Sequence, residues 1–477
     1  MSHGPQPLPA VPSQGQRVLV LGLGATGLSA ARWCAHRGAR VRVLDTRAAP
    51  PALPALRAAV PQAEVTLGPW RAEHFSGARM AILSPGVPRS DPEVQRALAT
   101  GLEVIGDVEL FARALAQHAE AHALAHPRVL AITGSNGKST VTAMAGALCA
   151  GAGLETLVAG NIGLPVLDAL ADMESGARPW PQAVVLELSS FQLESTRSLA
   201  PDAATILNLS EDHLDRYGTM QAYGAAKAGI LRGARVQVVN RDDPWTQRLA
   251  LPRAPVWSFG LGVPGPGPQW GLLADGEPWL AEGTRRILPV SRLRVAGLHN
   301  AANALAALAL CRAIGLEYER LVAALTGFEG LPHRVQLVAE LRGRRFFDDS
   351  KGTNVGATVA ALNGMREPVV LIAGGEGKGQ DFAPLARALA GRVRTLVLIG
   401  RDAELIARAA AGSGVAMMRA ASMEEAVQAA FAASRTGDAV LLSPACASFD
   451  MFRDYEHRAE MFRAAVHHLE AACPMRA

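Results

Sequence analysis

Apolar residues form short continuous runs along the chain, and the first of them is Val18–Leu21. A run of this length that ends at a glycine turn is typical of a strand buried in a parallel sheet. The glycine turn is followed by a helical stretch and then by a second apolar run, Val41–Leu44. The pattern therefore predicts a strand–turn–helix–strand unit at the start of the chain.

The same alternation of strand and helix patterns continues through the sequence and restarts after residue 330. Such alternation is typical of α/β domains with parallel sheets, and we expect three of them. The tract at 259–272 is rich in Gly and Pro, so we expect a surface excursion there. Further strands are predicted at 80–87, 128–133, 183–190, 203–210, 344–350, 369–375, 395–400 and 439–445, and helices at 107–127 and 297–315.

Composition narrows the class of protein. The 477 residues, 49% of them hydrophobic, suit about three domains that each bury a core. No apolar run approaches the ~20 residues of a membrane span, and the Pro/Gln-rich N-terminus lacks the apolar segment of a signal peptide. The five cysteines form no CxxC pair, and the net charge of +4 is not gathered in a basic block. We expect a cytoplasmic protein, by default a monomer, that binds no nucleic acid.

The first glycine turn, GLGATG at 22–27, follows a predicted strand. Its GxGxxG spacing, with Asp45 at the end of the next strand, is the fingerprint of dinucleotide-binding proteins, whose backbone amides approach a pyrophosphate. An NAD-dependent dehydrogenase is therefore one hypothesis. The spacing is weak by itself, because any close strand–helix turn can use it.

The second glycine loop, TGSNGKST at 133–140, indicates a phosphate site more strongly. The general GxxxxGK[ST] spacing fails, because Ile132 stands at its first position. Gly134, Gly137, Lys138 and Ser139 instead form a shorter loop between a predicted strand and a predicted helix. Its amides can surround phosphates, its Ser can bind magnesium, and its Lys can reach the terminal phosphates.

Lysine is rare in this chain. Only four of the 47 Lys plus Arg residues are lysines: Lys138, Lys227, Lys351 and Lys378. Arginine serves wherever a plain surface cation suffices. The four exceptions are therefore informative, because lysine offers a compact amine that can also lose its proton.

The shortened phosphate loop resembles that of the Mur ligases and the related folylpolyglutamate synthetases, which are ATP-dependent amide-forming enzymes. The resemblance to the Mur ligases covers the chain from about residue 17, and all four lysines fall within its motifs or beside them. These motifs include GNIGLP (160–165), LELSSFQLE (186–194), LNLSEDHLDRYG (207–218), YGAAKAGI (223–230), LHNAANALAA (298–307), GLPHR (330–334), DSKGTNVGAT (349–358) and LLSPACASFD (441–450).

The resemblance implies a fold of three α/β domains. A Rossmann-like domain at 1–106, with 1–16 as a tail, would bind the UDP part of a substrate. A central P-loop ATPase-type domain at 107–330 would bind ATP. A Rossmann-like domain at 331–477 would bind an amino acid.

The resemblance also implies a reaction. ATP would activate UDP-N-acetylmuramoyl-L-alanine as an acyl phosphate, and D-glutamate would then be joined to it, with release of ADP and phosphate, in peptidoglycan precursor synthesis. Lys138, Glu187, His213 and Lys227 would be catalytic. Two Mg²⁺ ions, which prefer oxygen ligands, would be held by Ser139, Glu187, His213 and Lys227 as a carbamate.

The remaining residues are assigned by the resemblance to three binding sites. ATP would meet Gly134, Ser135, Asn136, Gly137, Lys138, Ser139, Thr140, Asn300, Asn303, Arg334, Asp349 and Lys351. The UDP part would meet Ala25, Thr26, Asp45, Thr46, Arg47, Gly86 and Asn161. D-Glutamate would meet Thr353, Lys378, Ser448, Phe449 and Tyr455, where the last two replace a Leu and a Phe of the family.

Several alternatives stay open at this point. The enzyme could be a Mur ligase with another acceptor amino acid, an NAD-dependent dehydrogenase, or a nucleotide-binding regulator without catalysis, which would not need Lys227. Asn300 could cap a helix rather than contact adenine. His118, His122 and His126 have the spacing of a metal-binding stripe, although a solvated polar face is the simpler explanation.

Overall fold

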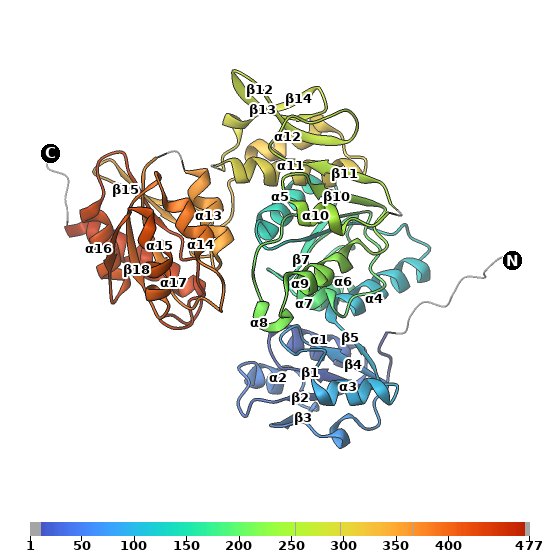
Figure 1. The fold of residues 1–477 in the computed structure, drawn as a ribbon. Helices are drawn as coiled ribbons and strands as arrows, with labels where there is room; N and C mark the ends of the chain where they lie inside the picture. Colours follow the sequence, from blue (N-terminus) through green and yellow to red (C-terminus); the bar gives the residue numbers. More distant parts are fainter. Residues whose placement is uncertain (1–10, 253, 296, 366, 473–477) are drawn as a thin grey trace.

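The computed structural model of the chain describes residues 11–252, 254–295, 297–365 and 367–472. Their strands form three sheets of five, nine and six strands, with helices packed against them. Figure 1 shows these as three α/β domains, which confirms the predicted fold class. The domain limits at 106 and 330 stay a prediction.

The N-terminal sheet is wholly parallel and has the strand order β3–β2–β1–β4–β5. This order, with helices on both faces, is a doubly wound arrangement whose switch point lies between β1 and β4. The strands are β1 (Arg17–Leu21), β2 (Arg40–Asp45), β3 (Glu64–Leu67), β4 (Met80–Leu83) and β5 (Glu103–Ile105), and the helices are α1 (Ala25–His36), α2 (Leu53–Ala59) and α3 (Pro92–Ala99).

The central sheet has the order β14–β13–β12–β11–β10–β9–β6–β8–β7. The two pairings at its β14 edge, β12–β13 and β13–β14, are antiparallel. β6 is an inner strand, so the loop that follows it emerges from the middle of the sheet. The strands are β6 (Arg128–Thr133), β7 (Thr156–Gly160), β8 (Ala183–Glu187), β9 (Ala203–Ile206), β10 (Val236–Asn240), β11 (Val256–Phe259), β12 (Gln269–Asp275), β13 (Glu277–Glu282) and β14 (Arg285–Pro289).

Alternate residues of β6 face opposite cores. Val129 and Ala131 pack on the side of α4 (Asp107–Ala121), α6 (Val166–Glu174) and α9 (Met220–Ala228). Leu130 and Ile132 pack on the side of α5 (Lys138–Gly151), α11 (Leu298–Ala313) and α12 (Tyr318–Gly327). The strand is buried on both faces, which is why its sequence is apolar without interruption.

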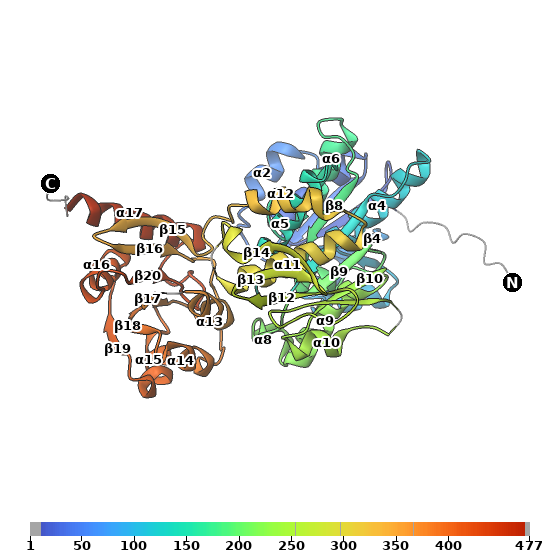
Figure 2. The same cartoon turned by 90° about the horizontal axis from the view of Figure 1, so that it is seen from above.

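The C-terminal sheet has the order β15–β16–β20–β17–β18–β19 and is parallel except for the β15–β16 pair. Figures 1 and 2 both show this domain standing to one side of the central domain. Its strands are β15 (Gln336–Leu341), β16 (Arg344–Asp348), β17 (Val369–Gly374), β18 (Val393–Ile399), β19 (Ala416–Arg419) and β20 (Ala439–Leu442), and its helices are α13 (Val355–Gly364), α14 (Ala383–Leu389), α15 (Ala403–Ala410), α16 (Met423–Ala433) and α17 (Tyr455–Ala472).

The predicted surface excursion at 259–272 is wrong for its last residues. Strand β12 begins at Gln269, and the Trp270 side chain is fully buried, with its Nε1 donating to the Tyr318 hydroxyl at 2.8 Å. The glycines and prolines that precede Gln269 form only the loop that leads into β12. Among the residues that the structure describes, no helix is long and apolar enough to cross a membrane.

The histidine stripe does not form. Helix α4 ends at Ala121, so His126 does not continue the face that carries His118. The His118 ring instead stacks on Trp180, with centroids 3.3 Å apart. The described residues contain no group of three or more His, Cys, Asp or Glu side chains arranged to hold a metal ion.

Candidate active site

The loop between β6 and α5 is held in shape by its glycines and by a neighbouring loop. Gly137 caps α5 with φ at 82°, and a Cβ there would lie 2.7 Å from Asn303 Oδ1, so only glycine fits. Asn208 Oδ1 accepts from the Asn136 amide at 2.8 Å. Asn208 follows β9 and was not among the predicted site residues, although it lies inside a motif that was noted.

Lys138 folds back over this loop. Its Nζ donates to the carbonyls of Gly134 and Ser135, each at 2.9 Å. Burial lowers the pKa of Lys138, against the attraction of the Glu187 and Asp212 carboxylates. The ammonium is therefore desolvated and placed where phosphates would replace its present partners.

Lys227 projects from α9 into the same place. Its side chain is fully buried, and its Nζ donates to Gly134 O at 2.8 Å and to Thr133 Oγ1 at 3.2 Å. Burial and then the charge of Lys138 hold the pKa of Lys227 well below its usual range. Such an amine loses its proton more readily than an exposed lysine, whereas an arginine stays charged.

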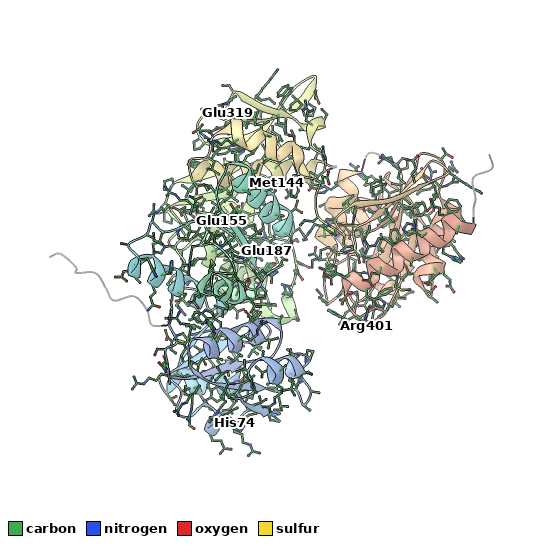
Figure 3. The ribbon with its side chains drawn as sticks, turned by 180° about the vertical axis from the view of Figure 1, so that it is seen from behind. His74, Met144, Glu155, Glu187, Glu319 and Arg401 are labelled. Atoms are coloured by element: carbon green, nitrogen blue, oxygen red, sulfur yellow. The ribbon has the colours of Figure 1, made fainter. Side chains whose placement is uncertain are left out.

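Glu187 ends β8 and is buried beside these two lysines. Its Oε1 accepts from Asn161 Nδ2 at 3.0 Å, whereas its Oε2 is buried without a hydrogen-bond partner. Figure 3 shows Glu187 in the central domain on the side that faces the C-terminal domain. A buried carboxylate oxygen without a partner, near several cations, is suited to bind a cation such as a metal ion.

His213 sits at the edge of the site with its backbone in the left-handed region, φ 54°. Burial lowers its pKa, while Asp212 opposes this shift. Asp212 also approaches Lys378 of the C-terminal domain, whose Nζ lies 4.0 Å from Asp212 Oδ1. These three residues line one small cavity, so the structure brings His213 and Lys378 together.

A second cavity lies between the central and C-terminal domains. Arg334 crosses from the C-terminal side, and its Nη2 donates to Ser139 Oγ at 2.6 Å. Eight of the predicted ATP-binding residues line this cavity: Asn136, Gly137, Thr140, Asn300, Asn303, Arg334, Asp349 and Lys351.

Two features of this second cavity bear on its chemistry. Asn300 Oδ1 accepts from Asn303 Nδ2 at 3.1 Å, while the N-cap of α11 is Gly297, so Asn300 does not cap the helix. His299 also lines the cavity and was missed by the sequence analysis. Burial and Arg334 lower the pKa of its imidazole to about 4, so it is neutral at physiological pH.

The residues predicted for D-glutamate follow the ends of three neighbouring strands. Thr353 comes after β16, Lys378 after β17, and Ser448 after β20. Ser448 is buried, whereas Phe449 is 70% exposed. The Lys351 ammonium lies 3.5 Å from the centroid of the Tyr455 ring, a cation–π contact that joins this group to the second cavity.

Most of the residues predicted for UDP lie at the carboxyl ends of β1, β2 and β4 in the N-terminal sheet. Asp45 Oδ2 accepts from the Leu23 amide at 2.7 Å and pairs with Arg47. Burial alone would raise the pKa of Asp45, but these hydrogen bonds bring it to about 2. Ala25 and Gly86 are exposed beside it, at the start of α1 and after β4. Asn161 is engaged by Glu187 instead.

Comparison with known proteins identifies the family. Residues 16–106, 132–311 and 333–446 match models of the Mur ligase MurD-like N-terminal domain, the Mur ligase middle domain and the Mur ligase glutamate ligase domain. A UDP-N-acetylmuramoylalanine–D-glutamate ligase from Thiobacillus denitrificans is 57% identical over 97% of this chain and 98% of the relative. This chain belongs to the Mur ligase family.

Other proteins similar to this Mur ligase agree. A relative of the same name from Methylobacillus flagellatus is 55% identical over 95% of this chain and 97% of its own length. UDP-N-acetylmuramate-alanine ligase MurC from Thermotoga maritima has a TM-score of 0.59 at 19% identity, covering 96% of this chain and 99% of its own. MurF from Acinetobacter baumannii has a TM-score of 0.58 at 21% identity, covering 82% and 92%. These two structures support the fold alone.

Proposed function

We propose that this Mur ligase joins D-glutamate to UDP-N-acetylmuramoyl-L-alanine at the expense of ATP. The main support is that Lys138, Lys227 and Glu187 lie together at one buried end of the phosphate loop. Arg334 reaches the same loop from the C-terminal domain. Such a cluster serves phosphoryl transfer between two anions rather than hydride transfer. The dehydrogenase hypothesis also loses support because residues 16–106 match the MurD-like N-terminal domain.

Formation of an acyl phosphate brings the substrate carboxylate to the γ-phosphate of ATP. Lys138 and Arg334 would offset the repulsion, and the loop amides at the start of α5 would hold the phosphates in line. ADP leaves as the carboxylate oxygen bonds to phosphorus. The amine of D-glutamate then attacks the acyl carbon, loses a proton, and expels inorganic phosphate.

The residues present fit the proposed Mg²⁺ ions. Glu187 Oε2 is buried without a partner, and Lys227 has the lowered pKa that carbamate formation needs, since only a neutral amine adds carbon dioxide. Ser139, Glu187, His213 and carbamylated Lys227 would hold two ions. When bound, Mg²⁺ supplies positive charge that offsets the charge on the transferred phosphoryl group.

The acceptor end is proposed from the strand ends of the C-terminal sheet. Lys378, Thr353 and Ser448 would bind the carboxylates of D-glutamate, and Lys378 would exchange its present neighbour Asp212 for one of them. Another acceptor amino acid is the nearest alternative, because specificity depends on the shape around Phe449 and Tyr455.

Inorganic phosphate release tests the reaction. Purified protein receives ATP, Mg²⁺, UDP-N-acetylmuramoyl-L-alanine and D-glutamate, and each component is then omitted in turn. We expect release only when all four are present, with D-glutamate preferred over L-glutamate, lysine and diaminopimelate. Release with a different amino acid would keep the mechanism and change the acceptor, whereas no release from folded protein would refute the proposal.

Binding of all substrates should draw the C-terminal domain toward the central one. The contacts that join the two sides across the site include Arg334 to Ser139 and Asn354 Nδ2 to Asn136 Oδ1 at 3.1 Å, and these lie where substrates would enter. We expect small-angle scattering to show a smaller radius of gyration with a non-hydrolysable ATP analogue and both substrates than with buffer alone. An unchanged radius, with binding verified by calorimetry, would contradict closure.

Asp349→Asn should raise stability while weakening ATP binding. Burial raises the pKa of Asp349 to about 7. The Ser443 hydroxyl, which donates to Asp349 Oδ2 at 2.6 Å, acts in the opposite direction and lowers this pKa. An unfolded aspartate titrates near 3.9. The stability from this group is therefore complete below pH ~4 and is lost as the pH rises through about 7.

The neutral amide avoids that loss, so the variant should exceed the wild type by about 1–4 kcal/mol at pH 8 and match it near pH 4. Urea unfolding at both pH values measures this difference. Calorimetry should show ATP bound at least ~10-fold more weakly, because Asp349 lines the cavity proposed for ATP and the substitution replaces one acceptor oxygen with a donor. Equal stability at pH 8 would show that the pKa of Asp349 is not raised in the folded protein.

A further inference from the structure

Helix α8 (Leu214–Tyr217), directly after His213, is clamped to one carboxylate. Arg216 donates from Nε and Nη2 to the two oxygens of Glu194, at 3.2 Å and 2.7 Å. The Tyr217 hydroxyl donates to the same carboxylate at 2.6 Å. Both members of the Arg216–Glu194 pair are largely buried, with side-chain exposures of 15% and 19%. A bidentate, partly desolvated pair of this kind sets the orientation of a short helix.

Arg216 also crosses to the N-terminal domain. Its Nη1 donates to the carbonyl of Pro85 at 3.0 Å. Pro85 precedes Gly86, which the family resemblance assigns to the UDP part of the substrate. The same loop is tied to the first glycine turn, because Ser84 Oγ donates to Gly22 O at 2.8 Å. One guanidinium group therefore contacts both the central domain and the loop that would hold the UDP substrate.

The other end of this connection is His213. The amides of Arg216 and Tyr217 donate to the His213 carbonyl at 3.0 Å and 3.1 Å. The Phe191 ring lies between the two side chains, 4.2 Å from the Arg216 guanidinium carbon and 4.7 Å from the His213 ring. The left-handed backbone of His213 is unfavourable for a non-glycine residue and depends on such surroundings.

We propose that Arg216 is a positioning residue that couples the Pro85–Gly86 loop of the N-terminal domain to His213. The carbonyl of Pro85 holds Arg216, and Arg216 with Glu194 holds α8 and the imidazole in front of it. Binding of the UDP substrate at this loop would therefore stabilise the orientation of His213. This inference rests on the proposed function and on the family resemblance, which assigns Gly86 to the UDP substrate and His213 to catalysis.

Two substitutions test the coupling in the full-length enzyme. Arg216→Lys keeps a positive charge but cannot bind Glu194 at two points and Pro85 at once. Tyr217→Phe keeps the ring and removes one hydrogen bond to Glu194. We expect Arg216→Lys to lower kcat about 10- to 100-fold and to raise KM for the UDP substrate, with KM for ATP and D-glutamate unchanged. Tyr217→Phe should change the same two constants, but less.

Arg248→Lys serves as the matched control. Arg248 also lies over an aromatic ring, that of Trp245 at 5.1 Å, and its Nε also donates to a proline carbonyl, that of Pro244 at 3.2 Å. Both contacts lie within its own helix, α10 (Pro244–Leu249). This variant should keep wild-type constants, so a change seen only at Arg216 is not a general effect of removing a stacked arginine.

A double-mutant cycle decides whether Arg216 acts through His213. If it does, Arg216→Lys should lower kcat far less in a His213→Ala background than in the wild type. Additive effects, equal increases in all three KM values, or constants like those of Arg248→Lys would overturn the inference. Wild-type enzyme that releases no phosphate would instead refute the proposed function, so the two failures are distinguishable.

Discussion

Lys227→Arg is expected to lower ligase activity at least ~10²–10³-fold, the loss that follows removal of one preorganised electrostatic partner from an active site. The wild-type amine is buried, and its surroundings hold its pKa well below the usual range. Arginine cannot lose its proton, so it can neither add carbon dioxide nor become an anionic ligand. The arginine would also place a fixed positive charge beside Lys138, so we expect the melting temperature of the variant to be lower than that of the wild type.

Rescue of activity by small carboxylic acids distinguishes a role of Lys227 as a carbamate from a purely structural role. Lys227→Ala leaves space in which formate or acetate can supply the missing carboxylate, so tens of millimolar acid should restore part of the phosphate release. Lys227→Arg fills that space and should not respond. Carbon-13 NMR with labelled bicarbonate gives a readout independent of activity, since the wild type should show a carbamate signal that both variants lack. Full activity of Lys227→Arg would refute the assignment.

Lys138→Arg is expected to reduce phosphate release by a similar factor. The Lys138 ammonium fits between the carbonyls of Gly134 and Ser135, in a loop where even a Cβ at Gly137 would meet Asn303. A planar guanidinium is larger than this space and would displace the loop from its phosphate-binding shape. Kinetics should show a loss in kcat and weaker ATP binding, with KM for the UDP substrate nearly unchanged.

Lys378→Arg is the matched comparison for Lys138→Arg. Lys378 is 28% exposed and faces a cavity between domains, so a larger cation can be accommodated there. A guanidinium can also bind a carboxylate at two points. We therefore expect a change of less than ~10-fold, confined to KM for D-glutamate. Equal losses at Lys138 and Lys378 would show that steric fit at the phosphate loop is not the cause.

The strands were predictable wherever apolar residues ran without interruption, as in Val18–Leu21 and Val369–Gly374, because burial on both faces leaves no polar positions. The hairpin strands β12 to β14 were missed because the surface loop predicted from the Gly/Pro-rich composition was extended beyond that composition to include Trp270. The Asp-Gly pair at 275–276, between two alternating runs, is a hairpin signal that would have found them.

The candidate site was predictable as a set of residue types after strand ends, because parallel strands present their carboxyl ends at one edge. Lys138 after β6, Glu187 at the end of β8 and Lys378 after β17 all follow this rule. Asn208 and His299 were missed, since their importance comes from what faces them in space: the Asn136 amide and the cavity beside Arg334.

The sequence by itself determined the three α/β units, the two glycine loops and the four positions where lysine was kept. These are local properties, set by periodicity, backbone freedom and side-chain size. Only the tertiary structure decided that Arg334 meets Ser139 across 195 residues, that the pKa of Lys227 is lowered, and that Arg216 joins Pro85 to Glu194. Each depends on burial or on a partner from another domain, and local sequence patterns carry no record of either.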